Sequence, residues 1–438
     1  MTAMRDRHTS PARPRASGQR GFTLVELLVA MAAGLVVSLA AFLLSKNATR
    51  FFQNEARASA SHLAATIGLN RLATDLQRAA YLSTGNIQSP NDNQRCGAPP
   101  ITPTGLRLLA GVTIQRQGSV FLHPSELGQS IVNSMWPDAI IIGGSLNSTE
   151  VFESRVVNDN GSWYIRLLDS AATRRTIQRA QGGGQGLEDI FQGGRFLRIS
   201  RPNQKHLYAV IDRMEPGNLV FLKSPPGVTT RDVEPECGLP LSGAHAWVSV
   251  ISRVRYDIRS LVGKATSYSS LVTPITPALT GDNGRTELVR IELDDEDQER
   301  PETLEVIAEY AVDLKFGISA LQADTAQQKI TPQITRYPIT ATDNANVYTI
   351  AAANNQPLAR PEDVRSVQIR LSTRTRAPDR DVGFPVGTDG RRLRFLIPGI
   401  VSGVNTLADT VPAGAPPVFA RMRTLYADVA LPNLAEPR

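Results

Sequence analysis

The sequence predicts an α+β protein in which one long N-terminal helix, transmembrane in its lower half, packs on a mostly antiparallel β globular domain. The first observation behind this prediction is a largely apolar run over residues 22–44, whose only charged residue is Glu26. The second is a proline-free continuation over residues 46–82, rich in the good helix formers Ala, Leu, Arg, Gln and Glu. The third is a long remainder in which short strand-like runs alternate with turn residues.

The apolar run is suited to spanning a bilayer. Phe22–Leu44 contains 23 residues, which at about 1.5 Å per residue cover roughly 34 Å, enough for the hydrocarbon core. It is longer than the apolar region of a secretory signal peptide, about 7–15 residues, and no clear small-x-small cleavage site follows it. A charge inside such a segment costs about 2.5–3.5 kcal/mol on insertion scales, so we expect Glu26 to have a function.

The positive charge of the chain is concentrated before this run. The formal net charge is +6, and residues 1–21 hold five arginines and one aspartate, which leaves about +2 for residues 22–438. Arginines on one side of a transmembrane helix predict a cytoplasmic N-terminus, with the body of the chain across the membrane. The near-neutral remainder does not favour a basic partner-binding surface, and no nucleic acid partner is expected.

The helix is expected to continue beyond the membrane over residues 45–82. Two apolar stripes at helical spacing, rotated from each other, predict a change of packing partner along it. The first stripe contains Phe52, Ala56, Leu63 and Ile67, and the second contains Leu69, Leu72, Leu76 and Ala80. A single helix from Phe22 to about Leu82 would be roughly 90 Å long. The alternative is an ordinary amphipathic helix pair with a kink near Gly68.

Residues 83–438 are expected to form the β-rich globular domain with long loops, and no fixed-period repeat is visible. Period-2 alternation over Val367–Leu371 predicts a half-buried strand. Residues 83–104, 171–194 and 319–362 are expected to be loops. The expected strands are Ala139–Ile142, Trp163–Leu168, Phe196–Ile199, Leu207–Ile211, Leu219–Leu222, Ala246–Ile258, Glu287–Leu293, Leu304–Ile318, Val364–Ser372, Arg392–Ile397 and Arg423–Val429.

The N-terminal motif Gly21-Phe22-Thr23-Leu24-Val25-Glu26, after a short basic leader, resembles the signal of type IV pilins and type II secretion pseudopilins. The resemblance implies that a prepilin peptidase removes residues 1–21 by cutting after Gly21 and methylates the new N-terminal Phe22. It also implies that Glu26 sets the register of assembly by pairing with the new amine of a neighbouring subunit. Such pairing is better attested for registry than for net stability. The alternative is an incidental glutamate near the membrane edge.

Several segments of the body resemble the PilW group of minor pilins. They are Asp138–Ile142, Trp247–Ile251, Glu287–Arg290, Val306–Gly317, Val364–Val367 and Arg421–Leu434. The resemblance implies a structural subunit, not an enzyme, that primes or caps pilus assembly at the tip. Its implied partners are the prepilin peptidase, the major pilin, other minor pilins, a PilY-like tip adhesin and the inner membrane, with the pilus on the cell surface as destination. The alternatives are a J-like minor pseudopilin of a type II secretion system and a membrane-tethered periplasmic binding protein or enzyme.

No pattern in the sequence predicts a catalytic, cofactor or metal site. His123, His206 and His245 lie outside any hydrolase or metalloprotease motif. Gly182–Gly186 lacks the Gly-Lys-Ser/Thr ending of a phosphate-binding loop and is expected to be a flexible loop. The acidic run Asp294–Glu299 lacks the spacing of a calcium loop and is expected to be a solvated hairpin tip.

Cys96 and Cys237 are the only cysteines, and both follow the apolar run. An even pair in an oxidising compartment suits a disulfide, and two buried free thiols are the alternative. A bond closing a loop of this length would contribute roughly 4–5 kcal/mol by chain entropy.

Overall fold

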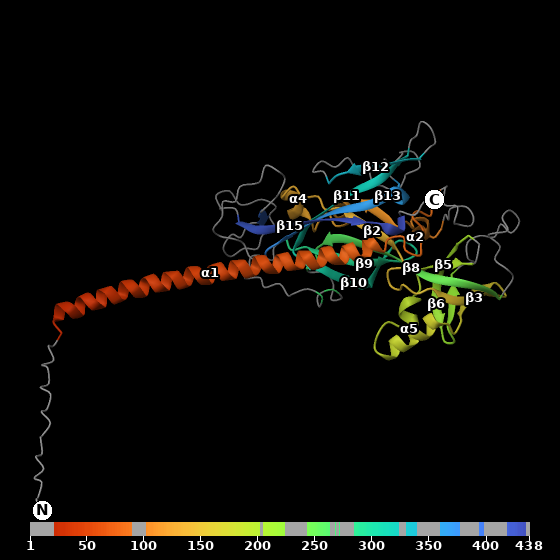
Figure 1. Cartoon of the computed structure of the whole chain (residues 1–438), viewed down its shortest axis with the longest axis horizontal. Helices are drawn as coiled ribbons and strands as arrows, with labels where there is room; N and C mark the ends of the chain where they lie inside the picture. The colour runs from red at the N-terminus through yellow and green to blue at the C-terminus, as the bar shows by residue number, and fades with distance from the viewer. Residues whose placement is uncertain are drawn as a thin grey trace, which may run out of the picture. The chain divides into compact units, whose positions relative to one another are not determined.

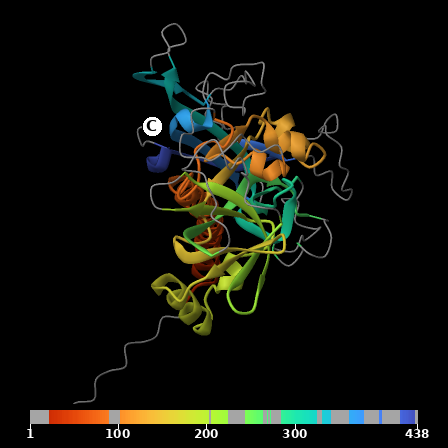
Figure 2. The same cartoon turned by 90° about the vertical axis from the view of Figure 1, so that its right-hand side faces the viewer.

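The computed structural model describes residues 22–89, 102–201, 205–223, 243–262, 268, 271, 284–323, 330–339, 360–376, 394–397 and 418–434 (Figures 1 and 2). The chain divides into two compact units, Met1–Ala56 and Arg57–Arg438, which are described separately. The leader with Gly21, together with Cys96 and Cys237, lies outside the described residues, so cleavage and the disulfide stay predictions.

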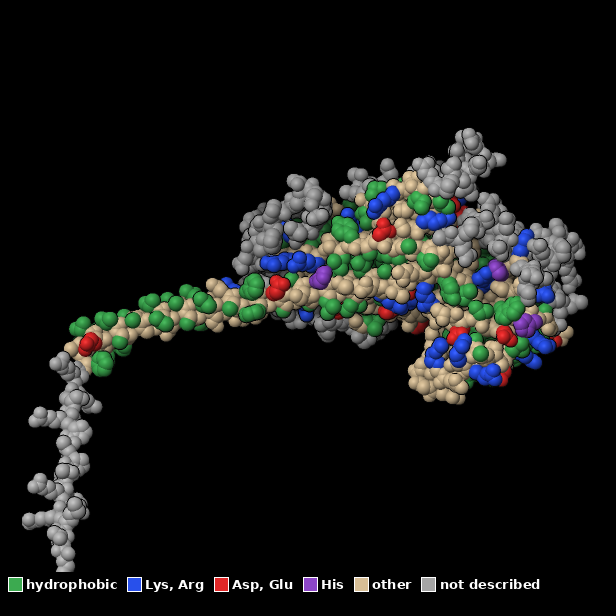
Figure 3. Space-filling model, in the orientation of Figure 1, with side chains coloured by type: hydrophobic (Ala, Val, Ile, Leu, Met, Phe, Trp, Pro, Cys, Tyr) green, Lys and Arg blue, Asp and Glu red, His purple; other side chains and the backbone are tan. Residues whose placement is uncertain are grey.

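A single helix, α1 (Leu24–Gln77), contains 54 residues. In the first unit its apolar side chains are exposed along its length (Figure 3). The helix runs unbroken through Gly68, where a Cβ would lie only 3.2 Å from the Cβ of Ala308, so glycine permits close contact with the sheet there. It ends five residues before Leu82, because Ala80 adopts a φ of 60° and its N–H donates to the carbonyl of Gly143 at 2.8 Å.

The second unit contains two antiparallel sheets. The larger sheet has ten strands, and most of them follow the order β1-β2-β8-β3-β4-β7-β6-β5, with β9 on β8 and β10 on β9. Its strands are β1 (Val112–Gln115), β2 (Ala139–Gly144), β3 (Phe152–Asp159), β4 (Ser162–Leu167), β5 (Phe196–Ser200), β6 (Leu207–Glu215), β7 (Leu219–Leu222), β8 (Ala244–Arg259), β9 (Glu287–Leu293) and β10 (Glu299–Glu309).

The 16-residue strand β8 belongs to two structures at once. Its first half pairs with β3 and β5, and its second half pairs with β2 and β9. Because β5 returns to β8, the strands β8, β3, β4, β7, β6 and β5 close into a six-stranded barrel. Closure removes the free edges that an open sheet presents to other chains.

The barrel has an apolar interior that two helices help to fill. Helices α5 (Ala171–Gln181) and α6 (Leu187–Ile190) add Ala172, Leu187 and Ile190 to its core. Ser170 caps α5 by accepting a hydrogen bond from the Thr173 N–H at 3.3 Å. The expected loop at 171–194 is therefore wrong over these helices.

The smaller sheet has the strand order β12-β11-β13-β15-β14. Its strands are β11 (Ala311–Ala323), β12 (Ile330–Tyr337), β13 (Val364–Arg374), β14 (Arg394–Ile397) and β15 (Val418–Ala430). The short helices are α2 (Thr104–Arg107), α3 (Gly118–Leu122), α4 (Gly128–Val132), η2 (Pro361–Asp363) and η3 (Pro432–Leu434).

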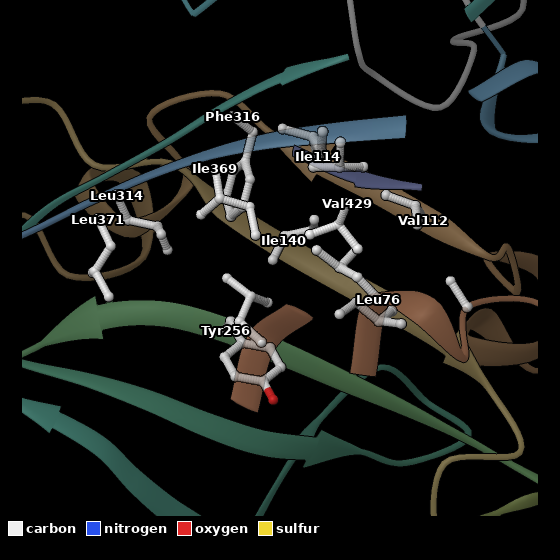
Figure 4. Close-up of a cluster of buried hydrophobic side chains, with 14 of the residues drawn as sticks. Leu76, Val112, Ile114, Ile140, Tyr256, Leu314, Phe316, Ile369, Leu371 and Val429 are labelled. Atoms are coloured by element: carbon white, nitrogen blue, oxygen red, sulfur yellow. The ribbon is translucent and has the colours of Figure 1, made fainter. Parts of the chain in front are cut away.

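The main core lies where α1 meets both sheets. Leu72 and Leu76 of α1 are fully buried in a cluster that includes Ile140, Phe316 and Ile369 (Figure 4). The second predicted stripe of α1 is thus the face that docks on the chain's own β domain.

The antiparallel β domain is confirmed, and most predicted strands coincide with observed ones. The predicted strand Leu304–Ile318 is wrong, since it divides into β10 and β11 at Tyr310, which has a φ of 57°. The expected loop over 319–362 is also wrong in part, because it contains the end of β11 and all of β12. Strands β1 and β3 were not predicted.

Candidate functional site

The N-terminal end of α1 forms a reciprocal cap. The Thr23 hydroxyl accepts a hydrogen bond from the Glu26 N–H at 3.2 Å, and Glu26 Oε2 accepts from the Thr23 N–H at 2.9 Å and from its hydroxyl at 3.0 Å. This is a capping box, which satisfies N–H groups that have no partner inside the helix. Within the described part of the chain, Glu26 Oε1 receives no hydrogen bond. One carboxylate oxygen therefore positions the helix end and the other is open to a partner.

The same end of the helix is apolar outside its cap. Phe22 is 83% exposed. Among the described helices, α1 is the one long and apolar enough to cross a membrane. The predicted cleavage site at Gly21 and Phe22 thus immediately precedes the capped start of this helix.

Asp75 anchors the upper part of α1 to the β domain, and the sequence analysis did not identify it. Its carboxylate is 1% exposed and accepts hydrogen bonds from the Tyr256 hydroxyl at 2.8 Å and the Arg290 Nε at 2.7 Å. Burial, and then the nearby Asp75 carboxylate, raise the pKa of Tyr256, so the phenol stays a donor. The sequence did contain a signal for this anchor, since Asp75 is a lone acid within the apolar stripe around Leu72 and Leu76.

Asp138 joins the two sheets just before β2. Its buried carboxylate accepts from Arg116 Nη1 at 2.9 Å and from Lys315 Nζ of β11 at 3.0 Å. The backbone N–H groups of Gln117 and Phe316 also donate to it, at 2.9 and 3.2 Å. Burial nevertheless raises the pKa of Asp138.

The acidic run Asp294–Glu299 forms the hairpin tip between β9 and β10, as predicted, and Glu296 at the tip is exposed. The expectation that the run is solvated is wrong for Asp295, which is 4% exposed and pairs with Lys223 at 2.8 Å. Asp297, 30% exposed, pairs with Arg253 of β8 at 2.7 Å. Cations from elsewhere in the fold therefore neutralise two of its carboxylates.

Three side chains have the composition of a metal site. The ligand atoms of His123, Asp257 and Glu299 lie within 4.8 Å of one another. Asp257 already accepts from Arg255 Nε at 3.0 Å and Arg259 Nη2 at 2.6 Å, and Glu299 accepts from Arg259 Nη1 at 2.8 Å. A dication here would meet two guanidinium groups, so these residues fit an ion-pair network better than a metal centre.

The other candidate residues do not converge. His206 precedes β6, His245 lies on β8, and His123 follows α3. Gly182–Gly186 joins α5 to α6 and has exposed residues over most of its length, without the strand-to-helix setting of a phosphate-binding loop.

A family model described as the prokaryotic N-terminal methylation motif matches residues 16–42. No curated protein and no solved structure matches the chain. The N-terminus is therefore that of a prepilin-type, type IV pilin-like protein, a class processed by prepilin peptidase and anchored through its first helix. Cleavage after Gly21, methylation of Phe22 and the register role of Glu26 stay predictions for this chain.

Proposed function

We propose that this protein is a non-enzymatic minor pilin resembling the PilW group, which primes or caps a type IV pilus at its tip. The observation that carries the proposal is the methylation motif placed directly before an exposed apolar helix. The proposed orientation places the N-terminus in the cytoplasm and the β domain across the inner membrane.

Helix α1 offers a surface for further subunits above its membrane segment. In the second unit Leu63 is 60% exposed and Ile67 is 55% exposed, on the face opposite the docked residues Leu72 and Leu76. Exposed apolar side chains in a row favour contact with another protein. This supports assembly through α1, with the major pilin, other minor pilins and a PilY-like adhesin as proposed partners.

Processing is the direct test of this proposal. The full chain is expressed with and without prepilin peptidase and weighed by mass spectrometry. We expect the peptidase to remove residues 1–21 and to add one methyl group to Phe22. An unchanged mass would favour a membrane-tethered binding protein or enzyme. A Gly21→Leu variant, expressed with the peptidase, is the matched control and is expected to keep its leader.

The tip location follows from the size of the β domain. The second unit, Arg57–Arg438, is bulky, and repeating it along a tightly packed filament would cause steric overlap. A label at Ile334 of β12, which is 58% exposed, should appear at filament ends. Decoration along the whole shaft would contradict the tip position. Secretion defects without loss of pili in a deletion strain would favour the J-like pseudopilin.

A further inference from the structure

The outer face of the six-stranded barrel carries two arginines that pair with no acidic side chain among the described residues. Arg155 of β3 and Arg166 of β4 are exposed and lie directly opposite each other in the strand register. Neither forms an ion pair or a side-chain hydrogen bond with any residue that the structure describes. Like charges directly opposed on paired strands destabilise the pair, so fold stability does not explain this arrangement.

His245 extends the pair into a row across three strands. It lies opposite Arg155 in the register of β3 with β8, and its side chain is 45% exposed. The nearest carboxylate is that of Glu153, 3.9 Å from His245 Nε2. We call His245, Arg155 and Arg166 the basic row.

Aromatic rings flank the basic row on both sides. Two residues after His245, Trp247 packs edge-on against the imidazole with ring centroids 5.2 Å apart. Two residues before Arg166, Tyr164 pairs across the strands with Phe221 of β7 at 5.3 Å. All three aromatic side chains are only partly buried.

Among the described residues, few other charges surround the basic row. Glu153 borders the row, and Arg213 beyond Phe221 is already paired with Asp212 and with Glu215, the latter at 2.8 Å. Two adjacent guanidiniums with so few cations beside them in the described part of the barrel do not suit a phosphate polymer, whose binding depends on many cationic contacts. They suit a chain with well-separated carboxylates, because each guanidinium fork can bind a carboxylate through two hydrogen bonds.

We propose that this face of the barrel binds an acidic polysaccharide, a chain of sugars that carry carboxylate groups. Arg155 and Arg166 hold the carboxylates, while Trp247 and Tyr164 contact the apolar C–H faces of the sugar rings, and Phe221, under the Arg213 guanidinium, supports Tyr164. The proposal goes beyond pilus assembly and does not depend on it, since the whole surface lies within one barrel of the free protein.

The test is a binding measurement on the detergent-solubilised full chain. The probes are polygalacturonate, neutral dextran and oligothymidylate of matched length. We expect binding to polygalacturonate alone. Arg155→Gln with Arg166→Gln should weaken it about a hundredfold, since each of the two lost charged contacts is worth about tenfold. Arg174→Gln on α5, whose arginine is 61% exposed, is the matched control and should bind as the wild type does.

A stability measurement separates loss of the site from loss of the fold. Removing two opposed charges should leave the thermal midpoint of the double variant unchanged or raise it. Failure of the wild type to bind polygalacturonate, or equal binding by the double variant, would overturn the proposal. Preferential binding of oligothymidylate would also overturn it, in favour of a nucleic acid surface. None of these outcomes alters the expected processing at Gly21.

Discussion

Two carboxylates on helix α1 lie in opposite environments. Glu26 is exposed, and within the described chain its side chain is bonded only to Thr23. Asp75 is 1% exposed and is held by Tyr256 and Arg290 of the β domain. The comparison shows that the groups bound to a carboxylate decide its role. A carboxylate with partners in its own chain fixes the fold, and one with an open oxygen is suited to binding another subunit.

The largest effect on stability is expected from Asp75→Ala. The substitution leaves the buried Arg290 guanidinium and the Tyr256 hydroxyl without their shared acceptor, which should lower the free energy of unfolding by about 3–5 kcal/mol. The matched control is Asp169→Ala. Asp169 is 77% exposed and pairs with Arg174 at 3.7 Å, outside the network of Asp75, so its loss should cost no more than about 1 kcal/mol. Denaturant unfolding of the full chain measures both, and equal losses would contradict the assigned anchor.

A smaller effect on stability is expected when the pH is lowered, because of the buried side chain of His206. Burial, and then the nearby Arg198 guanidinium, lower the pKa of His206 from 6.5 to about 4. Between these values the unfolded chain binds a proton that the folded chain does not, so stability falls as the pH drops from 6.5 towards 4. Allowing for solvent screening, the loss should be about 1–2 kcal/mol.

The variant His206→Gln isolates this contribution to the pH dependence. The difference in free energy of unfolding between wild type and variant should change over that pH range and stay constant above it. The matched control is His62→Gln, because His62 lies exposed on α1. A difference between wild type and His206→Gln that is independent of pH would show that the buried imidazole is not responsible.

The smallest effect on stability is expected from Glu26→Gln, together with the largest effect on assembly. Glutamine keeps an acceptor for Thr23, so the free energy of unfolding should not change measurably. Leader cleavage should persist, while incorporation into filaments should fall sharply because the negative charge is gone. Glu55→Gln, at another exposed position on α1, should assemble normally. Normal incorporation of Glu26→Gln would remove the distinction between the two carboxylates.

The sequence was informative where local pattern decides structure. The apolar run, the helical stripe through Leu72 and Leu76, and strands such as β9 depend on residues close together along the chain. The prediction for Asp294–Glu299 held for the hairpin and failed for the environment of Asp295. The hairpin is local, but Lys223 and Arg253, which pair with Asp295 and Asp297, come from segments distant in the chain.

By itself the sequence determined a prepilin-type N-terminus, a membrane-length helix with a single acid near its start, and an antiparallel β domain. The first follows from the motif around Gly21 and Glu26. The other two follow from composition and from periods of two and 3.6 residues. Only the tertiary structure decided that the first half of β8 closes the barrel and that its second half pairs with β2 and β9. It alone placed Asp75 against Arg290 of β9, and Arg155 of the β3–β4 hairpin opposite His245 of β8. These contacts join segments far apart in the chain, where contact geometry rather than local preference selects the partner.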